Sequence, residues 1–243
     1  MFKGIVIACD VPFEKLPVLA RSTGQLDGVA GFKIGSLLAL EASLRKTVAE
    51  INTLSDKPVI YDHQKAGTDI PQMAEPLLSM CARSGARGTI IFPFAGPDTL
   101  RHWCRAWRRL TQNCVHDLIV GAVMTHPEFL VSEGGFLSDD MPKRVFTEAL
   151  KCGVRSFVLP ATKLHYATVL WDAYNSTECP GFEGEPINVY TPGLGRQQAE
   201  VDEAKIYIGK VPPFDWYPII GSAIYGAEDP TAAAKEWIEK LKP

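Results

Sequence analysis

The sequence predicts an α/β fold, and within that class a single (β/α)8 barrel. The chain has 243 residues, close to the ~250 that are typical of this barrel. Eight short apolar runs recur along it, and longer stretches with helical periodicity separate most of them. We see no linker, low-complexity tract or shift in composition that would mark a second domain, so we expect residues 1–243 to form one domain.

The apolar runs are the predicted strands. Several are nearly continuous β-branched or aliphatic stretches, which is typical of strands buried on both faces of a parallel sheet. A doubly wound open sheet is the alternative, but it usually has fewer strands and gives no reason for their number to be eight. The runs are 4–9, 29–34, 57–62, 87–92, 117–124, 154–159, 186–190 and 217–221.

Helices and loops are expected between these strands. Two polar segments rich in Gly and Pro, 128–143 and 175–186, are predicted to be loops with little regular structure. The predicted helices include 36–52, 71–84, 97–110, 163–175 and 229–241.

Composition narrows the class of function. The formal net charge is −3, with 25 Lys and Arg against 28 Asp and Glu and no long basic run, which disfavours binding to nucleic acid. The 6 cysteines are scattered without metal-ligand spacing, which favours free thiols in a reducing compartment. No stretch reaches the ~18 apolar residues of a membrane span, so we expect a cytoplasmic protein.

In a barrel of this kind, functional groups sit at the carboxyl ends of the strands and in the loops that follow. Charged groups at the ends of apolar strands are costly unless they are paired or used. The polar residues predicted to lie there are Asp10, Lys33, Asp62, Thr125 with His126, and Gln197.

The densest group of charges follows the third predicted strand. Asp62, Lys65 and Asp69 follow one another there, and Lys33 lies near the end of the neighbouring strand. Two carboxylates and two ammonium groups held together stabilise one another's charges and keep an acid ready to donate a proton. The alternative is a structural ring of ion pairs that closes the mouth of the barrel.

The spacing inside this group places a condition on the backbone. Asp62 and Lys65 are three residues apart, so in an ideal strand they would point to opposite faces. Convergence requires the strand to end at Asp62 or to contain a bulge, and Gly67 relieves part of the resulting strain.

Five motifs together resemble the orotidine 5′-phosphate decarboxylase family, in its order and across nearly the whole chain. The resemblance implies cofactor-free and metal-free decarboxylation of orotidine 5′-phosphate to uridine 5′-monophosphate, in de novo pyrimidine biosynthesis. The motifs are GFKIG (31–35), the D…K…D group, MTHP (124–127), PGLGRQ (192–197) and IIGSAIYGAEDP (219–230).

The resemblance also implies the catalytic roles. Lys65 would donate the proton and Asp62 would face the departing carboxylate, with Lys33 and Asp69 holding these two in place. In the family the last aspartate comes from a second subunit, so a homodimer with shared sites is implied.

The substrate-binding residues follow from the same resemblance. Asp10 would bind the ribose, Thr125 would meet the pyrimidine, and Gln197 would contact the base and the phosphate side. Glycines in these loops also let backbone N–H groups approach a phosphate closely, where barrels of this kind often bind one. The candidate phosphate residues are Gly193, Gly195, Arg196, Gly221 and Ser222.

Two departures from the family pattern keep other readings open. The usual D-x-K-x-x-D is here D-H-Q-K-A-G-T-D, and Ser222 stands where the family usually has a phosphate-binding arginine. One alternative is a related barrel enzyme acting on a sugar phosphate, such as a decarboxylase or aldolase, in some cases with Mg²⁺. Another is a barrel that binds a phosphorylated ligand without turning it over.

We predict that Arg196 supplies the charge that Ser222 lacks. A guanidinium can bind phosphate through two parallel hydrogen bonds, whereas a hydroxyl offers one and no charge. Arg196→Ala should therefore weaken the binding of a phosphorylated nucleotide by roughly ten-fold or more in calorimetry. Unchanged affinity would contradict this role.

Overall fold

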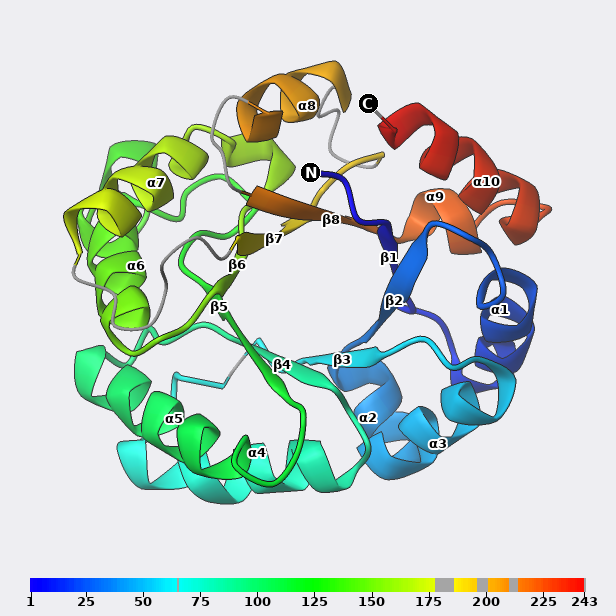
Figure 1. The fold of residues 1–243 in the computed structure, drawn as a ribbon, viewed down its shortest axis with the longest axis horizontal. Coiled ribbons are helices and arrows are strands. Elements are labelled where there is room, and N and C mark those ends of the chain that lie inside the picture. Colours follow the sequence, from blue (N-terminus) through cyan, green and yellow to red (C-terminus); the bar gives the residue numbers. More distant parts are fainter. Residues whose placement is uncertain (65, 178–185, 196–200, 210–213, 243) are drawn as a thin grey trace.

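A computed structural model describes residues 1–64, 66–177, 186–195, 201–209 and 214–242. Eight parallel strands close into a barrel in the order β1-β2-β3-β4-β5-β6-β7-β8, and helices surround it (Figure 1). The predicted (β/α)8 barrel is confirmed. The strands are β1 (Ile5–Ala8), β2 (Val29–Ile34), β3 (Val59–Asp62), β4 (Gly88–Ile91), β5 (Asp117–Gly121), β6 (Ser156–Val158), β7 (Ile187–Pro192) and β8 (Phe214–Ile220).

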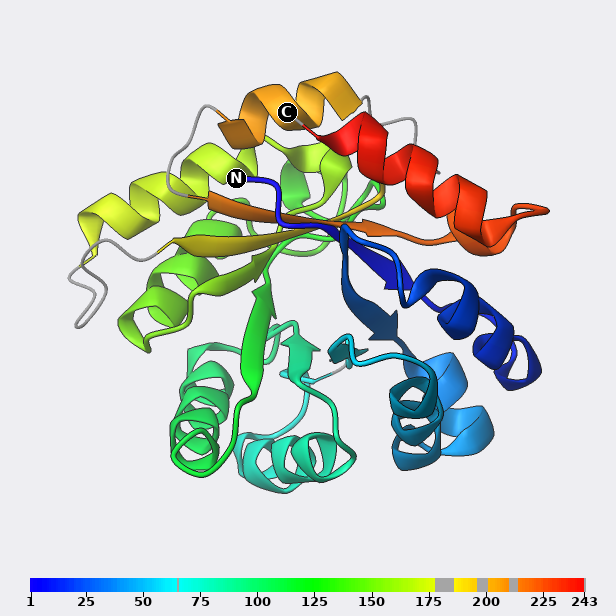
Figure 2. The ribbon, with the colours of Figure 1, turned by 45° about the vertical axis from the view of Figure 1, so that its right-hand side comes forward.

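The outer layer consists of α-helices with short 3₁₀ turns before some of them. The last helix packs against the first and so closes this layer (Figure 2, red and dark blue). The helices are α1 (Leu16–Thr23), α2 (Ser36–Ala42), α3 (Leu44–Leu54), α4 (Ala74–Arg83), α5 (Pro97–Leu110), α6 (Met141–Lys151), α7 (Tyr166–Ser176), α8 (Val201–Gly209), α9 (Ser222–Tyr225) and α10 (Pro230–Leu241). The 3₁₀ turns are η1 (Phe13–Lys15), η2 (Pro71–Met73), η3 (Val131–Glu133) and η4 (Ala161–Lys163).

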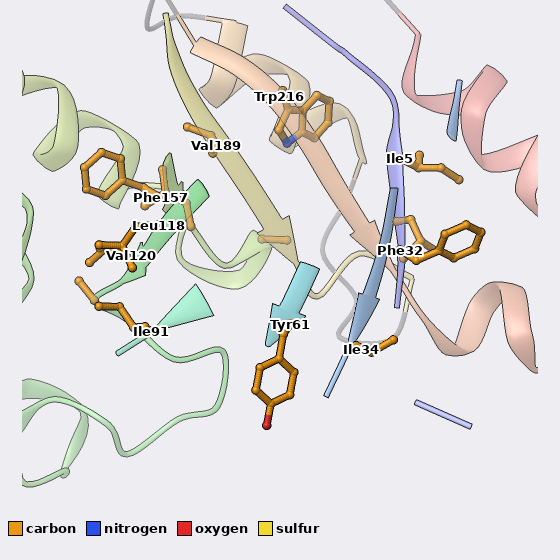
Figure 3. Close-up of a cluster of buried hydrophobic side chains, with 14 of the residues drawn as sticks. Ile5, Phe32, Ile34, Tyr61, Ile91, Leu118, Val120, Phe157, Val189 and Trp216 are labelled. Carbon is orange, nitrogen blue, oxygen red and sulfur yellow. The ribbon is translucent and has the colours of Figure 1, made fainter. Parts of the chain in front are cut away.

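Each strand has two buried faces, because alternate side chains point to opposite sides of a strand. On β2, Phe32 and Ile34 belong to the apolar layer between the sheet and the helices (Figure 3). A second, smaller cluster lies inside the barrel and includes Val6, Ile90 and Ile219. The continuous apolar runs of the sequence thus fill two separate cores.

The helix predicted over 36–52 is instead two helices that meet at Ser43. This residue has a left-handed φ of 69°, and its hydroxyl accepts a hydrogen bond from the N–H of Lys46 at 3.4 Å. A serine in this position satisfies an N–H group at the start of α3. The prediction was wrong here because helical periodicity on both sides of a cap looks continuous.

The segment 128–143 is more ordered than predicted. It contains η3 and an isolated β-bridge between Leu130 and Leu137, and α6 begins within it at Met141. Helices α1 and α6 were not among the predicted ones. Strand β8 begins at Phe214 rather than at 217, because Phe214 and Trp216 pair with β7.

Among the described residues, no helix is long and apolar enough to cross a membrane.

The imidazole of His116 lies buried at the amino-terminal end of the barrel, just before β5 and beside β4. Its Nδ1 lies 3.0 Å from the carbonyl oxygen of Ala86, and its Nε2 lies 2.9 Å from the hydroxyl of Thr89. The carbonyl can only accept, so Nδ1–H donates to it and Nε2 accepts from Thr89. Burial lowers the pKa of His116, and the nearby Arg87 lowers it further.

We predict that His116 makes the fold sensitive to acid. The folded protein binds this proton less readily than the unfolded chain, so the free energy of unfolding falls as the pH drops below about 6.5. His116→Gln should lose less stability than the wild type between pH 7.5 and 5.5 in urea titrations. An equal loss in both proteins would contradict the prediction.

Candidate active site

A cavity of about 220 Å³ opens at the carboxyl ends of the strands. Its apolar walls come from the barrel interior, with Ile90, Phe92, Val158 and Ile219 among them. Several sequence-predicted site residues line the same cavity, namely Asp10, Lys33, Asp62, Thr125, Gly193, Gly221 and Ser222. The structure therefore brings together residues from six of the eight strand ends.

A buried ion pair forms the charged wall of this cavity. Nζ of Lys33 lies 3.0 Å from Oδ2 of Asp62, and the two residues are 9% and 8% exposed. Lys33 lies between the outward-facing Phe32 and Ile34, and Asp62 follows the outward-facing Tyr61. Strand alternation therefore aims both charges into the barrel.

Asp10, just after β1, is the second carboxylate that forms an ion pair with Lys33. Its Oδ1 lies 3.7 Å from Nζ of Lys33, and its side chain is half exposed. Burial disfavours the charged ammonium, but the negative charges of Asp62 and then Asp10 outweigh burial and raise the pKa of Lys33. The ammonium thus stays protonated through the neutral pH range.

Asp62 retains an unused hydrogen-bonding atom. Its Oδ1 is buried and has no hydrogen-bond partner within the described ranges. Its Oδ2 accepts a hydrogen bond from Nζ of Lys33. The same oxygen lies 3.5 Å from the side-chain nitrogen of Gln64, which lines the cavity. A buried acceptor of this kind is costly unless a donor reaches it.

The sequence required the third strand either to end at Asp62 or to contain a bulge, and the structure shows that it ends there. Strand β3 ends at Asp62, and the chain then turns, with His63 stacked on Tyr61 at a ring separation of 5.1 Å. Gly67 has a φ of +89°, and a Cβ there would lie 2.7 Å from the Cα of Pro93. Glycine is therefore required at this position, and the strand ends where convergence needs it to.

Three predicted site residues cannot be placed. Lys65, Arg196 and Gln197 lie outside the described residues.

Asp69 does not join the charged wall of its own chain. It is exposed and absent from the cavity wall, and its Oδ1 accepts the N–H of Ile70 at 2.7 Å. Its backbone carbonyl accepts a hydrogen bond from Thr99 at 3.2 Å. The loop thus holds this carboxylate at the surface beside the mouth of the barrel.

The opposite wall is built from glycine-containing loops. Gly193 has a φ of 99°, and it lines the cavity together with Gly221 and Ser222. Gly195 has a φ of 85° but packs near Trp237, outside the cavity wall. Such loops offer backbone N–H groups to an anion, so this wall suits a phosphate.

Two further polar residues of the cavity were missed by the sequence analysis. Gln64 lies two residues after Asp62, just beyond the end of β3, and its place beside the charged group could have pointed to it. Tyr225 ends α9 and lines the cavity beside Gly221. No signal short of the tertiary contact identifies Tyr225.

No group of three or more metal-binding side chains occurs in the described part of the chain. His63 and His126 instead contact aromatic rings, those of Tyr61 and Phe129.

Comparison with known proteins agrees with this geometry. The sequence model of the Orotidine 5'-phosphate decarboxylase / HUMPS family matches residues 3–237. The orotidine 5'-phosphate decarboxylase of Methanosarcina mazei is 27% identical over 241 residues, which cover 98% of this chain and 94% of that relative. The enzyme of the same name from Methanocaldococcus jannaschii is 28% identical over 218 residues, or 88% of each chain.

Solved structures show the same fold. Orotidine 5'-monophosphate decarboxylase from Methanocaldococcus jannaschii, in complex with the inhibitor BMP, superimposes with a TM-score of 0.80 at 23% identity over 100% of both chains. Orotidine 5'-phosphate decarboxylase from Pyrococcus horikoshii OT3 gives a TM-score of 0.74 at 22% identity, again over 100% of both. With the family match spanning nearly its whole length, this chain belongs to the Orotidine 5'-phosphate decarboxylase / HUMPS family.

Proposed function

We propose that this chain decarboxylates orotidine 5′-phosphate to uridine 5′-monophosphate without a cofactor. The observation that carries the proposal is the buried Lys33–Asp62 pair, which faces a cavity whose opposite wall suits a phosphate. Every curated relative described above bears the name of this enzyme. A nucleotide with an anion at each end matches a cavity with charged groups at one side and glycine loops at the other.

The chemistry requires electrostatic stabilisation. Loss of CO₂ leaves an electron pair at C6 of the pyrimidine, where no ring π-system delocalises it. We assign Asp62 to face the departing carboxylate and Lys65 to stabilise the carbanion and protonate it. Lys33 and Asp69 would hold these two groups and their charges in place, which preorganises the site before the reaction begins.

The remaining contacts serve binding. Asp10 is assigned to the ribose, Thr125 to the pyrimidine, and Gln197 to the base and phosphate side. Binding energy from the phosphate then positions the reacting ring. We assign the phosphate to Gly193, Arg196, Gly221 and Ser222, and not to Gly195, which packs near Trp237 outside the cavity wall.

We further propose a cytoplasmic homodimer in which residues 1–243 form one catalytic domain. The surface position of Asp69 supports the dimer, because a carboxylate there can enter the site of a second subunit. The loop around it also exposes the apolar side chain of Ile70.

Ultraviolet absorbance of orotidine 5′-phosphate with chelator-treated protein tests the activity. A fast loss of substrate absorbance supports metal-free decarboxylation. Saturable binding without a spectral change would favour the binding-only alternative. No binding and no change would favour a sugar phosphate as substrate.

We predict that Lys65→Ala lowers the turnover number by at least ~10³-fold while ligand affinity changes far less. The partner charge of Lys65 exists only as CO₂ departs, so its removal acts on the transition state. The measurement is kcat by absorbance and Kd for uridine 5′-phosphate by calorimetry. Lys57→Ala, before the other end of β3, is the matched control and should stay within about two-fold of wild type. Near-normal turnover in Lys65→Ala would remove the assigned role.

A second prediction concerns the shared site. Lys65→Ala and Asp69→Ala homodimers should each be inactive, whereas co-expression should restore about a quarter of wild-type activity. Half of the randomly formed dimers are mixed, and each mixed dimer contains one site with both native residues. If Asp69 instead served its own chain, every site would lack one residue and no activity would return.

A further inference from the structure

The loop between β5 and α6 contributes Met124 and Thr125 to the wall of the cavity and contains several internal hydrogen bonds. Within it, η3 is followed by Gly134 with a φ of 87°, and Leu130 bridges to Leu137. The N–H and hydroxyl of Ser132 both donate to Asp139, at 3.1 and 2.6 Å. These contacts make the segment a compact unit whose position depends on how it is attached to the barrel.

Glu133 is the internal brace of this unit. Its carboxylate accepts the backbone N–H groups of Phe129 and Leu130, at 3.1 and 3.4 Å. These hydrogen bonds fix the backbone just after His126 and Pro127, and therefore the direction in which the loop leaves the barrel. Although burial raises the pKa of Glu133, these N–H groups and Lys163 hold it below its usual value.

Lys163, on η4 after the neighbouring strand β6, attaches the brace to the barrel. Its Nζ lies 2.6 Å from both carboxylate oxygens of Glu133 and 5.5 Å from the centre of the Phe129 ring. Lys163 is 7% exposed and does not line the cavity. A buried ammonium is costly unless it is paired, so the burial of Lys163 depends on its ion pair with Glu133 of the β5–α6 loop.

The residue before Lys163 holds the other end of the same loop. The hydroxyl of Thr162 donates to the backbone carbonyl of Thr125 at 3.1 Å. Thr125 and its neighbour Met124 line the cavity, as does Pro160 just before η4. Two consecutive residues after β6 thus anchor the start and the brace of the loop that carries Thr125.

We propose that Lys163 is a positioning residue which, through Glu133, fixes the β5–α6 loop and hence the wall that meets the pyrimidine base. The inference rests on the proposed function and extends it from residues in the cavity to one behind its wall. Lys163 contacts no substrate atom in this proposal and acts only through Glu133.

The test compares a ligand that has the base with one that lacks it. Calorimetry measures the affinity of the wild type, Lys163→Met and Glu133→Gln for uridine 5′-phosphate and for ribose 5-phosphate. Each variant should weaken uridine 5′-phosphate by roughly ten-fold and leave ribose 5-phosphate within about two-fold, because only the base meets the displaced wall. Lys163→Arg retains the charge and should restore most of the affinity.

A purely structural role has a different signature. Equal weakening of both ligands, or no change in either, would overturn the proposal, as would a Lys163→Arg protein as impaired as Lys163→Met. If Lys163→Met fails to fold, Glu133→Gln decides by the same ligand comparison. Wild-type protein that does not decarboxylate orotidine 5′-phosphate overturns the proposed function, whereas active wild type with unaffected variants overturns only the role of Lys163.

Discussion

Lys33 and Asp62 form an ion pair inside the mouth of the barrel, and the chemistry of the cavity depends on it. Both charges are buried, with 3.0 Å between Nζ and Oδ2. Removing one partner of such a pair typically costs about 3–5 kcal/mol, because the other charge is left without compensation. Asp62 therefore helps to keep Lys33 in its charged state, and the pair lines the cavity into which a ligand would bind.

The barrel makes this pair possible through two simple constraints. Alternation along β2 and β3 points Lys33 and Asp62 inward while Phe32 and Tyr61 face the helices. The register between the strands then sets their positions along the barrel axis. Lys33 of β2 pairs with Ile60 of β3, and β3 continues for two more residues to Asp62. Directly below them the inner cluster is largely apolar, with Ile60, Ile90 and Ile119 among its members, so an unpaired charge there would be costly.

The loops around the mouth of the barrel contribute to the cavity in different ways. Glycines at Gly193 and Gly221 expose backbone groups, whereas the β5–α6 loop is braced by a carboxylate and an ammonium. Rigid attachment matters because a displacement of about 1 Å at a reacting centre can cost ~100-fold in rate. Asp69 lies at the surface, outside the cavity wall of its own chain, and the shared site proposed above takes this carboxylate from a second subunit.

The eight apolar runs, the positions of Lys33 and Asp62 at strand ends and the glycine loops could all be predicted from the sequence. Each of them follows from local periodicity and from the rule that barrel sites lie at the carboxyl ends of strands. The break at Ser43 was not predictable in this way, because it depends on one backbone conformation inside a continuous helical pattern. Only the tertiary structure decided that Lys163 meets Glu133 across 30 residues of chain and that Tyr225 reaches the cavity. These contacts join segments that follow different strands of the barrel, so they depend on the closed barrel and not on any local sequence pattern.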